Sequence, residues 1–291
     1  MWFRARSHTL AGMERLALGH SAARMRSADR RGVLVLLCSM ATALVAGLLA
    51  WGPVVLTSDA HQYADQRELA GIPNALDVLS NLPLVAAGAW GWAATRNSRW
   101  STMMRRAWSR FFVSITASGT ASLLYHAAPG NFGFALTQLS VAASFALLLL
   151  CFLAERVDTR FAGVPACFIA CAAAALMAAL WWFGASRHGS GDLRGLLLLQ
   201  TLPVLLVPAG ALTLRGRQTT MCDWIAMLCL YGVGRMCGLA DAPILQMTGL
   251  VGGHALMHLA CAGVAAWPAW RCKQARRLQR APAFTHRITS S

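Results

Sequence analysis

Long apolar runs, separated by short charged or Gly/Pro-containing breaks, follow one another from residue 32 to residue 270. A run of about 18 apolar residues or more can cross a ~30 Å hydrocarbon layer as a helix, because a helix satisfies its own backbone hydrogen bonds. The pattern therefore predicts an all-α polytopic membrane helix bundle. Its eight expected spans are 32–56, 76–95, 110–128, 132–154, 163–185, 193–214, 222–241 and 249–270.

Local signals mark the ends of several spans. Residues 128–131 (Ala-Pro-Gly-Asn) predict a tight turn between the third and fourth, and Pro165 is expected in the first turn of the fifth. Asp192 is expected to be the N-cap of the sixth. The first run is about 25 residues long and lacks a small-residue cleavage pattern, which favours a stable anchor over a signal peptide.

Composition agrees with a membrane protein. Hydrophobic residues make up 57% of the chain and charged residues 13%, whereas soluble domains carry roughly a quarter charged residues. The nine cysteines are scattered singly, without a C-x-x-C pair, and most lie in apolar runs. Neither a disulfide framework nor a thiolate metal site is therefore indicated.

The net charge of +15 has two interpretations, nucleic-acid binding and the positive-inside rule for membrane proteins. If the Arg-rich segment 1–31 is cytoplasmic, the cytoplasmic loops hold Arg96, Arg99, Arg105, Arg106, Arg110, Arg156, Arg160, Arg215 and Arg217. The opposite loops hold Arg67, Arg187 and Arg194. This asymmetry excludes nucleic acid as a partner and predicts a bacterial-type inner-membrane protein with both termini cytoplasmic, including the basic tail 271–291.

Three histidines stand out, because a strongly polar side chain inside a membrane is costly and marks a candidate functional site. His254 and His258 are four residues apart and share one helix face. His126 is expected near the same, periplasmic, surface, with Ser122 one turn away on its helix. Three imidazoles plus an open position are typical of a catalytic zinc site. The alternative is helix packing through hydrogen bonds to Ser or Thr.

The other polar residues of the apolar runs and loops are interpreted as structural. Arg235 and Asp241 are six residues apart on the seventh expected span, so they do not form an i,i+4 pair, and Arg235 either pairs elsewhere or snorkels. No special role is expected for the remaining histidines, which are His8, His20, His61, His188 and His286.

The order S-x-x-x-H at 122–126, a polar position eleven residues later and H-x-x-x-H at 254–258 resembles the alkaline ceramidase family. This family belongs to a wider superfamily of seven-helix hydrolases that includes the adiponectin and progestin receptors. Residues 63–67, 71–74, 78–83 and 191–194 resemble bacterial members. The resemblance covers about residues 57–270, which makes span 32–56 an addition to a seven-helix core.

The resemblance implies zinc as the cofactor, with His126, His254 and His258 as its ligands. It implies that Ser122 donates a hydrogen bond to the oxyanion formed at the amide carbonyl. The implied partner is a ceramide-like lipid in the bilayer, cleaved to a long-chain base and a fatty acid. The family's calcium site is poorly matched by Asp59, Asp65 and Asn74, and no calcium is predicted.

One position departs from the family pattern. The family's Asp eleven residues after the first His is Thr137 here, followed by Gln138, and a threonine cannot accept a proton at neutral pH. Asp77 stands where relatives have Asn; it either supplies the missing carboxylate or is a helix-start charge favoured by the helix dipole. A degenerate relative that binds lipid or metal without turnover therefore remains an alternative, while a transporter finds little support without an inverted repeat.

Overall fold

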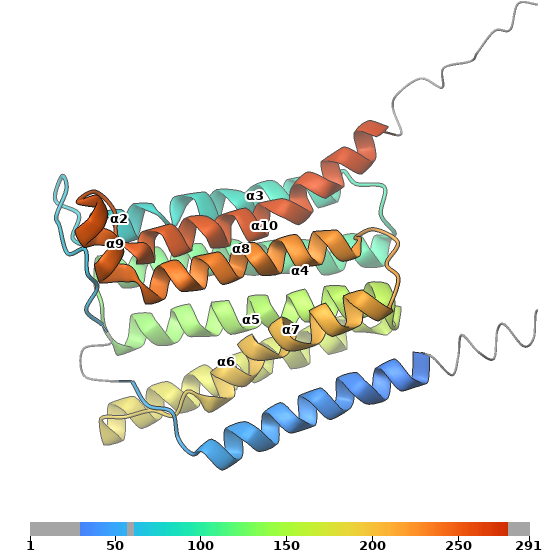
Figure 1. Ribbon diagram of the computed structural model, residues 1–291, viewed down its shortest axis with the longest axis horizontal. Helices are drawn as coiled ribbons and strands as arrows, with labels where there is room; N and C mark the ends of the chain where they lie inside the picture. Colours follow the sequence, from blue (N-terminus) through green and yellow to red (C-terminus); the bar gives the residue numbers. More distant parts are fainter. Residues whose placement is uncertain (1–29, 57–60, 279–291) are drawn as a thin grey trace, which may run out of the picture.

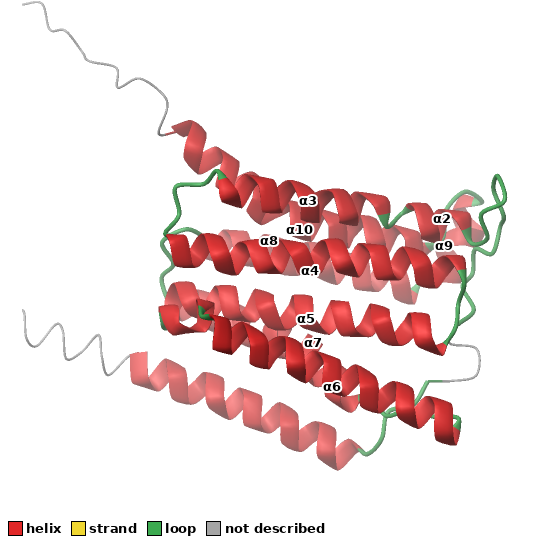
Figure 2. Cartoon of the chain, turned by 180° about the vertical axis from the view of Figure 1, so that it is seen from behind, coloured by secondary structure: helices red, strands yellow, loops and turns green. Residues whose placement is uncertain are grey.

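The computed structural model describes residues 30–56 and 61–278, and in these ranges the chain is a bundle of helices without a β-strand (Figures 1 and 2). The first helix is Arg30–Trp51. The others are α2 (Ala75–Leu79), α3 (Leu82–Arg96), α4 (Thr102–Ala127), α5 (Asn131–Arg156), the 3-10 turn η1 (Thr159–Ala162), α6 (Val164–His188), α7 (Arg194–Thr213), α8 (Met221–Leu239), α9 (Asp241–Thr248) and α10 (Gly253–Leu278).

Six of these helices form a closed ring. Each packs on the next in the order α3, α4, α5, α7, α8, α10 and back to α3, and α6 lies outside, against α5 and α7. Helix Arg30–Trp51 lies at the edge of the bundle (Figure 1) and buries little of its surface. It is held near its ends, where Arg30 donates to the Val157 carbonyl and Leu193 N–H donates to Val54 O at 2.8 Å.

The helices support an integral membrane protein. Five are long and apolar enough to cross a membrane, namely Arg30–Trp51, α5, α6, α7 and α8, or six if α9 and α10 form one bent span. Helices also occupy the other predicted span positions, but α3 has only 15 residues and α4 carries three arginines in its first three turns. The length and composition of the helices are therefore consistent with an integral membrane protein and do not establish all eight predicted spans.

The predicted span 76–95 is interrupted, which corrects the expectation of one continuous helix. α2 ends at Leu79, and α3 begins again at Leu82 with Pro83 in its first turn. Proline has no N–H to donate, and its ring would clash with the carbonyl of Leu79, four residues earlier in a continuous helix. The interruption leaves Ser80 and Asn81 between the two helices, where both are buried.

The predicted span 222–241 is also wrong at its end. α8 stops at Leu239, and Asp241 is the first residue of the short helix α9, which is bent by 106° from α10. Gly253 begins α10 close to the end of α8, where a Cβ would collide with the Cys237 carbonyl oxygen. The sequence pattern placed Asp241 on the same helix as Arg235, whereas the structure places it on α9.

Further boundaries differ from the prediction, including those of the last span, predicted at 249–270, which as α10 runs from Gly253 to Leu278. The first helix ends at Trp51 instead of residue 56, because Gly52 takes a φ of 89° and Pro53 follows. α4 starts eight residues before position 110, with Ser101 as its N-cap. Asp192 lies one residue before the N-cap of α7 and accepts the N–H groups of Arg194 and Val54. By contrast, the tight turn after α4 and Pro165 at the start of α6 are confirmed.

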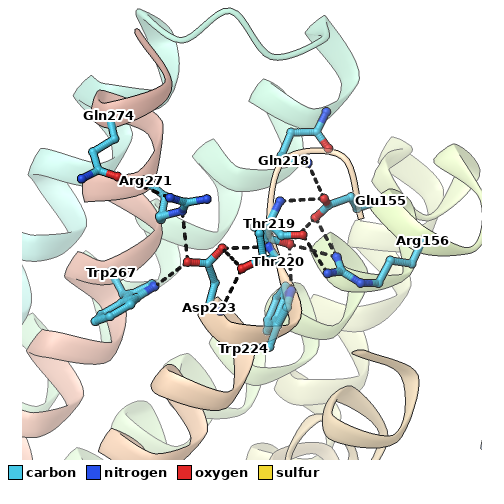
Figure 3. Close-up of polar contacts among 10 residues, drawn as sticks. All are labelled: Glu155, Arg156, Gln218, Thr219, Thr220, Asp223, Trp224, Trp267, Arg271 and Gln274. Atoms are coloured by element: carbon cyan, nitrogen blue, oxygen red, sulfur yellow. Dashed lines mark hydrogen bonds and ion pairs between the residues drawn. The ribbon is translucent and has the colours of Figure 1, made fainter. Parts of the chain in front are cut away.

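A buried polar cluster joins α5, α8 and α10 at one end of the bundle (Figure 3). Glu155 and Arg156 pair at 3.0 Å, with both side chains 1% exposed. Glu155 accepts the N–H groups of Gln218 and Thr219, while Arg156 donates to Thr219. A second group in the same cluster, also joined by hydrogen bonds, consists of Thr220, Asp223, Trp267 and Arg271. These contacts satisfy charges that would otherwise be costly to bury.

The two ends of the bundle differ in character. The loops predicted to be cytoplasmic, 97–101, 157–163 and 214–220, lie with this polar cluster at the end that we call the basic end. α2, α9 and the first turn of α10 lie at the opposite end (Figure 1), which we call the histidine end. The predicted tails 1–31 and 271–291 fall mostly outside the described residues, so their cytoplasmic location stays a prediction.

Candidate metal centre

Three histidines meet at the histidine end. His126 lies in the last turn of α4, and His254 and His258 lie on one face of the first turns of α10. One ring nitrogen of each lies within 4.8 Å of those of the other two, and the group is largely buried. The Nε2 atoms of His126 and His254 are 3.3 Å apart. The predicted convergence of these three side chains is confirmed.

The arrangement fits a metal ion. Two nitrogens that each lie about 2.0–2.1 Å from one tetrahedral ion are about 3.3–3.4 Å apart, and the His126 and His254 nitrogens have this separation. His258 completes a set of three imidazoles, its ring centroid lying 5.0 Å from that of His126 and 4.6 Å from that of His254. The three residues could therefore hold one ion and leave a fourth position open.

His258 is oriented by the interruption between α2 and α3. Its Nδ1 lies 2.8 Å from Ser80 Oγ and 3.2 Å from Asn81 Nδ2. The second ring nitrogen of a metal-binding histidine is normally fixed in this way, which leaves the other nitrogen for the ion. Ser80 and Asn81 belong to the stretch 78–83 that resembles bacterial ceramidases, but the sequence pattern gave no reason to assign them to the histidine site.

Asp241 fixes the backbone around the histidines. Its Oδ1 accepts the N–H of His254 at 2.9 Å, and its Oδ2 accepts the N–H of Ala64 at 3.0 Å. A carboxylate at the start of a helix accepts an N–H that has no partner inside that helix and is favoured by the helix dipole. Asp241 thus joins the first turn of α10 to the loop that precedes α2.

That loop places Tyr63 against the histidines. The Tyr63 ring centroid lies 4.5 Å from those of both His126 and His254. Burial raises the pKa of the Tyr63 hydroxyl above its ordinary value. Tyr63 belongs to the stretch 63–67 that resembles bacterial alkaline ceramidases, but its position over the histidines depends on how the loop folds.

His61 has a defined place, contrary to the expectation that it does nothing special. Its Nδ1 lies 2.8 Å from the Tyr125 hydroxyl, and its Nε2 lies 2.9 Å from Asn131 Oδ1. These contacts attach the same loop to the end of α4 and the start of α5. His61 lies 64 residues before Tyr125, and no local pattern predicts such a contact.

Asp77 lies in the first turn of α2, as predicted, but its environment is unusual. The side chain is 0% exposed, and neither carboxylate oxygen has a hydrogen-bond partner among the described residues. The backbone carbonyl of Asp77 accepts hydrogen bonds from the side chains of Ser80 and Asn81. The same two side chains contact His258. A buried carboxylate without a partner is costly, so a helix-start charge alone does not explain it.

Ser122 and Thr137 both line a cavity inside the ring. Ser122 is 6% exposed, and its hydroxyl makes no hydrogen bond within the described residues. The Thr137 hydroxyl donates to the Gly133 carbonyl of its own helix at 3.0 Å. Ser122 is therefore available to a ligand, whereas Thr137 uses its proton on the backbone.

The cavity has a volume of about 310 Å³ and mostly apolar walls. It begins at the three histidines and follows one face of α8 from Arg235 to Trp224, which are eleven residues or about 16 Å apart along a helix. A hydrogen-bonded pair, Gln138 and Gln200, crosses from α5 to α7 in its wall. The shape and lining suit an extended alkyl chain with a polar group at the histidines.

Two of the three residues that poorly match the calcium site of the alkaline ceramidases, Asp65 and Asn74, have other partners. Asp65 is 2% exposed and pairs with Arg67 at 2.6 Å. Asn74 donates to the His126 carbonyl at 2.9 Å, and Asp59 lies outside the described residues. An arginine already neutralises Asp65, as expected of a structural loop contact.

Arg235, interpreted from the sequence as structural or snorkelling, contacts the Met257 sulfur at 3.5 Å and also borders the cavity.

Comparison of the chain with protein-family models, with curated proteins and with solved structures finds no match. The interpretation of the site therefore depends on its geometry and on the residues it contains.

Proposed function

We propose that this chain is an intramembrane zinc hydrolase that cleaves the amide bond of a ceramide-type lipid near the periplasmic face of a bacterial-type inner membrane. The observation that carries the proposal is a cluster of three largely buried histidines at one end of a long, mainly apolar cavity. The histidines suit a metal, and the cavity suits a lipid chain. The resemblance to alkaline ceramidases supplies the reaction.

His126, His254 and His258 would hold the zinc. When bound, zinc polarises a carbonyl and lowers the pKa of water, which are the two requirements of amide hydrolysis. Ser80 and Asn81 orient His258. Ser122 lies in the cavity wall with its hydroxyl available to donate to the developing oxyanion, while the alkyl chains of the lipid occupy the cavity along α8.

The proposed reaction needs a group that carries a proton. Hydrolysis breaks the C–N bond, forms a C–O bond and moves one proton from water to the leaving amine. A positioned carboxylate can carry this proton, but Thr137 stands where the alkaline ceramidases have Asp, and its hydroxyl donates a hydrogen bond to the Gly133 carbonyl. Asp77 is the alternative carrier: it is buried beside Ser80 and Asn81, and its carboxylate has no hydrogen-bond partner among the described residues.

The state of Thr137 also favours a second candidate function, a degenerate relative that binds lipid or metal without turnover. This protein would keep the histidine cluster and the cavity, because binding needs no proton carrier. The two functions differ in turnover alone, so metal content and hydrolysis must be measured on the same preparation.

The first test is metal analysis of the full chain purified in detergent. We expect about one zinc per chain, lost in His126→Gln and in His258→Gln, because each replacement removes one of three nitrogen ligands. The control is His188→Gln, since His188 is exposed at the end of α6. Wild-type protein without zinc, or variants that retain it, would contradict the metal centre.

The second test is hydrolysis of ceramides of varied chain length, measured as release of the fatty acid and the long-chain base. If the chain is a zinc hydrolase, both products are released, and their release stops when a chelator removes the zinc. Bound zinc without release, also after Thr137→Asp, would instead establish the degenerate function.

A further inference from the structure

Four arginines share a groove at the basic end, which is the opposite end of the bundle from the histidines. Arg96 comes from the end of α3, and Arg105, Arg106 and Arg110 come from the first turns of α4. Cys167 and Cys171 of α6 line the other wall. We call this hollow, which has a volume of about 840 Å³, the basic groove.

No carboxylate of residues 30–56 or 61–278 neutralises the positive charge of the basic groove. No carboxylate lines it, and none of its four arginines forms an ion pair with another described residue. Arg96 lies over the Trp92 ring at 4.7 Å, and Arg110 donates to the Ala162 carbonyl at 2.8 Å. Four like charges held together repel one another unless an anion joins them.

The deeper part of the basic groove is mainly apolar. Arg106, Arg110, Val113 and Ala117 follow at intervals of four, three and four residues, so they lie on one face of α4. Arg110 and Ala117 are about 10 Å apart along the helix. Leu147 of α5 also lines the groove. The charged entrance at the basic end therefore leads to an apolar surface that runs toward the middle of the bundle.

We infer that the basic groove binds an anionic phospholipid of the leaflet at the basic end. Its phosphate would lie among Arg96, Arg105 and Arg106, and an acyl chain would lie along Val113 and Ala117. The positive-inside rule explains why arginines collect at this end, but it does not require them to share a hollow. Basic pockets between membrane helices bind anionic lipid headgroups. A soluble anion would leave the apolar surface unused.

The test compares lipid binding by the full chain in dodecyl maltoside, measured by native mass spectrometry during titration with phosphatidylglycerol or phosphatidylcholine. We expect a preference for phosphatidylglycerol. The triple variant Arg96→Gln, Arg105→Gln, Arg106→Gln should lose about fivefold in affinity per arginine, or about 100-fold in total. Arg110 is kept because it also holds η1.

A matched triple variant controls for net charge. Arg99, Arg215 and Arg217 are exposed, lie at the same end and do not line the basic groove. Their replacement by Gln removes the same charge and should leave phosphatidylglycerol binding unchanged. Equal losses in both triple variants would show general charge attraction and overturn the proposal, as would a groove variant with wild-type affinity.

A single variant tests the apolar part. Ala117→Trp fills the deeper groove on an exposed position of α4 and leaves all four arginines in place. It should weaken phosphatidylglycerol binding at least tenfold, while thermal unfolding checks that the bundle is intact. If Ala117→Trp binds phosphatidylglycerol as the wild type does, and inorganic phosphate at millimolar concentration displaces the lipid, the groove is an anion site and the lipid proposal fails.

Discussion

The histidine cluster is built by residues that would not themselves contact a metal. Ser80 and Asn81 fix the ring of His258, and Asp241 fixes the backbone of His254. Such contacts commonly decide metal affinity, because they set the ring orientation before the ion binds. By contrast, the Nδ1 atom of His126 is buried without a hydrogen-bond partner among the described residues, and the His126 ring packs against Tyr63 and Tyr125.

In the proposed reaction, we expect the residue at position 137 to limit the rate. Thr137 lines the cavity and cannot accept a proton, and general acid–base assistance is typically worth about 10²–10⁴-fold. We expect Thr137→Asp to raise the turnover of ceramide, provided that zinc is bound. Release of the long-chain base measures this rate.

The matched control for that experiment is Asp77→Asn in the natural sequence. If Asp77 carries the proton, this replacement abolishes the residual activity, because it removes the buried carboxylate without changing its size. If activity survives unchanged, Asp77 is a structural residue and not the proton carrier.

At the scale of the elements, interruptions in helices create the histidine end. Pro83 separates α2 from α3 and exposes Ser80 and Asn81 to His258, while the bend between α9 and α10 brings Asp241 to His254. At the basic end, helices are instead joined by the buried polar cluster (Figure 3). The two ends thus use different means to order the ring.

Removal of one partner of the buried ion pair should destabilise the bundle. Glu155→Gln leaves Arg156 buried without its counter-charge, and breaking a buried pair typically costs about 3–5 kcal/mol. We expect a clearly lower thermal unfolding midpoint in detergent. Glu68→Gln is the control, because Glu68 is exposed in the loop before α2. Equal midpoints for the two variants would show that the ion pair contributes nothing to stability.

The contribution of the loop before α2 to the stability of the bundle should be lost at acid pH. Hydrogen bonds from the Arg67 guanidinium hold the pKa of the Asp65 carboxyl below its usual range. A lowered pKa contributes stability that is present above the unfolded value, near 3.9, and is lost as pH falls through the folded value. The thermal midpoint of the wild type should therefore drop below about pH 4. This drop should be smaller in Asp65→Asn, and an identical pH profile would argue against the contact.

At the scale of the whole molecule, the ring encloses the cavity while α6 and helix Arg30–Trp51 pack outside it. The cavity walls come from α3, α4, α5, α7, α8 and α10, which are the members of the ring. The histidine cluster and the basic groove lie at opposite ends, so hydrolysis and lipid binding can be tested separately.

The orientation in the membrane is tested by reporter fusions. The arginine distribution predicts a cytoplasmic basic end and a periplasmic histidine end. A reporter after residue 278 should therefore give a cytoplasmic signal, and one inserted near Asp65 should give a periplasmic signal. The reverse pattern would place the candidate metal centre on the cytoplasmic side, and signals from one side for both would mean an even number of spans between them, instead of the predicted seven.

Much of the helical framework could be predicted from the sequence, because membrane helices depend on local features. Apolar runs located the long helices, and the four-residue spacing of His254 and His258 placed them on one face. The meeting of His126 with this pair also followed, since alternate spans return to the same end. The helix ends were less accurate: the apolar runs did not indicate the local breaks at Gly52 and Pro83, and the start of α10 at Gly253 depends on its close approach to α8.

The tertiary structure alone decided which residues surround the histidines and where the hollows lie. Ser80 and His258 are 178 residues apart, and Ala64 and Asp241 are 177 apart. A contact over such a distance depends on the order of helices around the ring, which no local pattern records. The cavity and the basic groove likewise arise between helices, from side chains that each helix contributes separately. The sequence thus determined the helices and the candidate ligands, and packing determined the site.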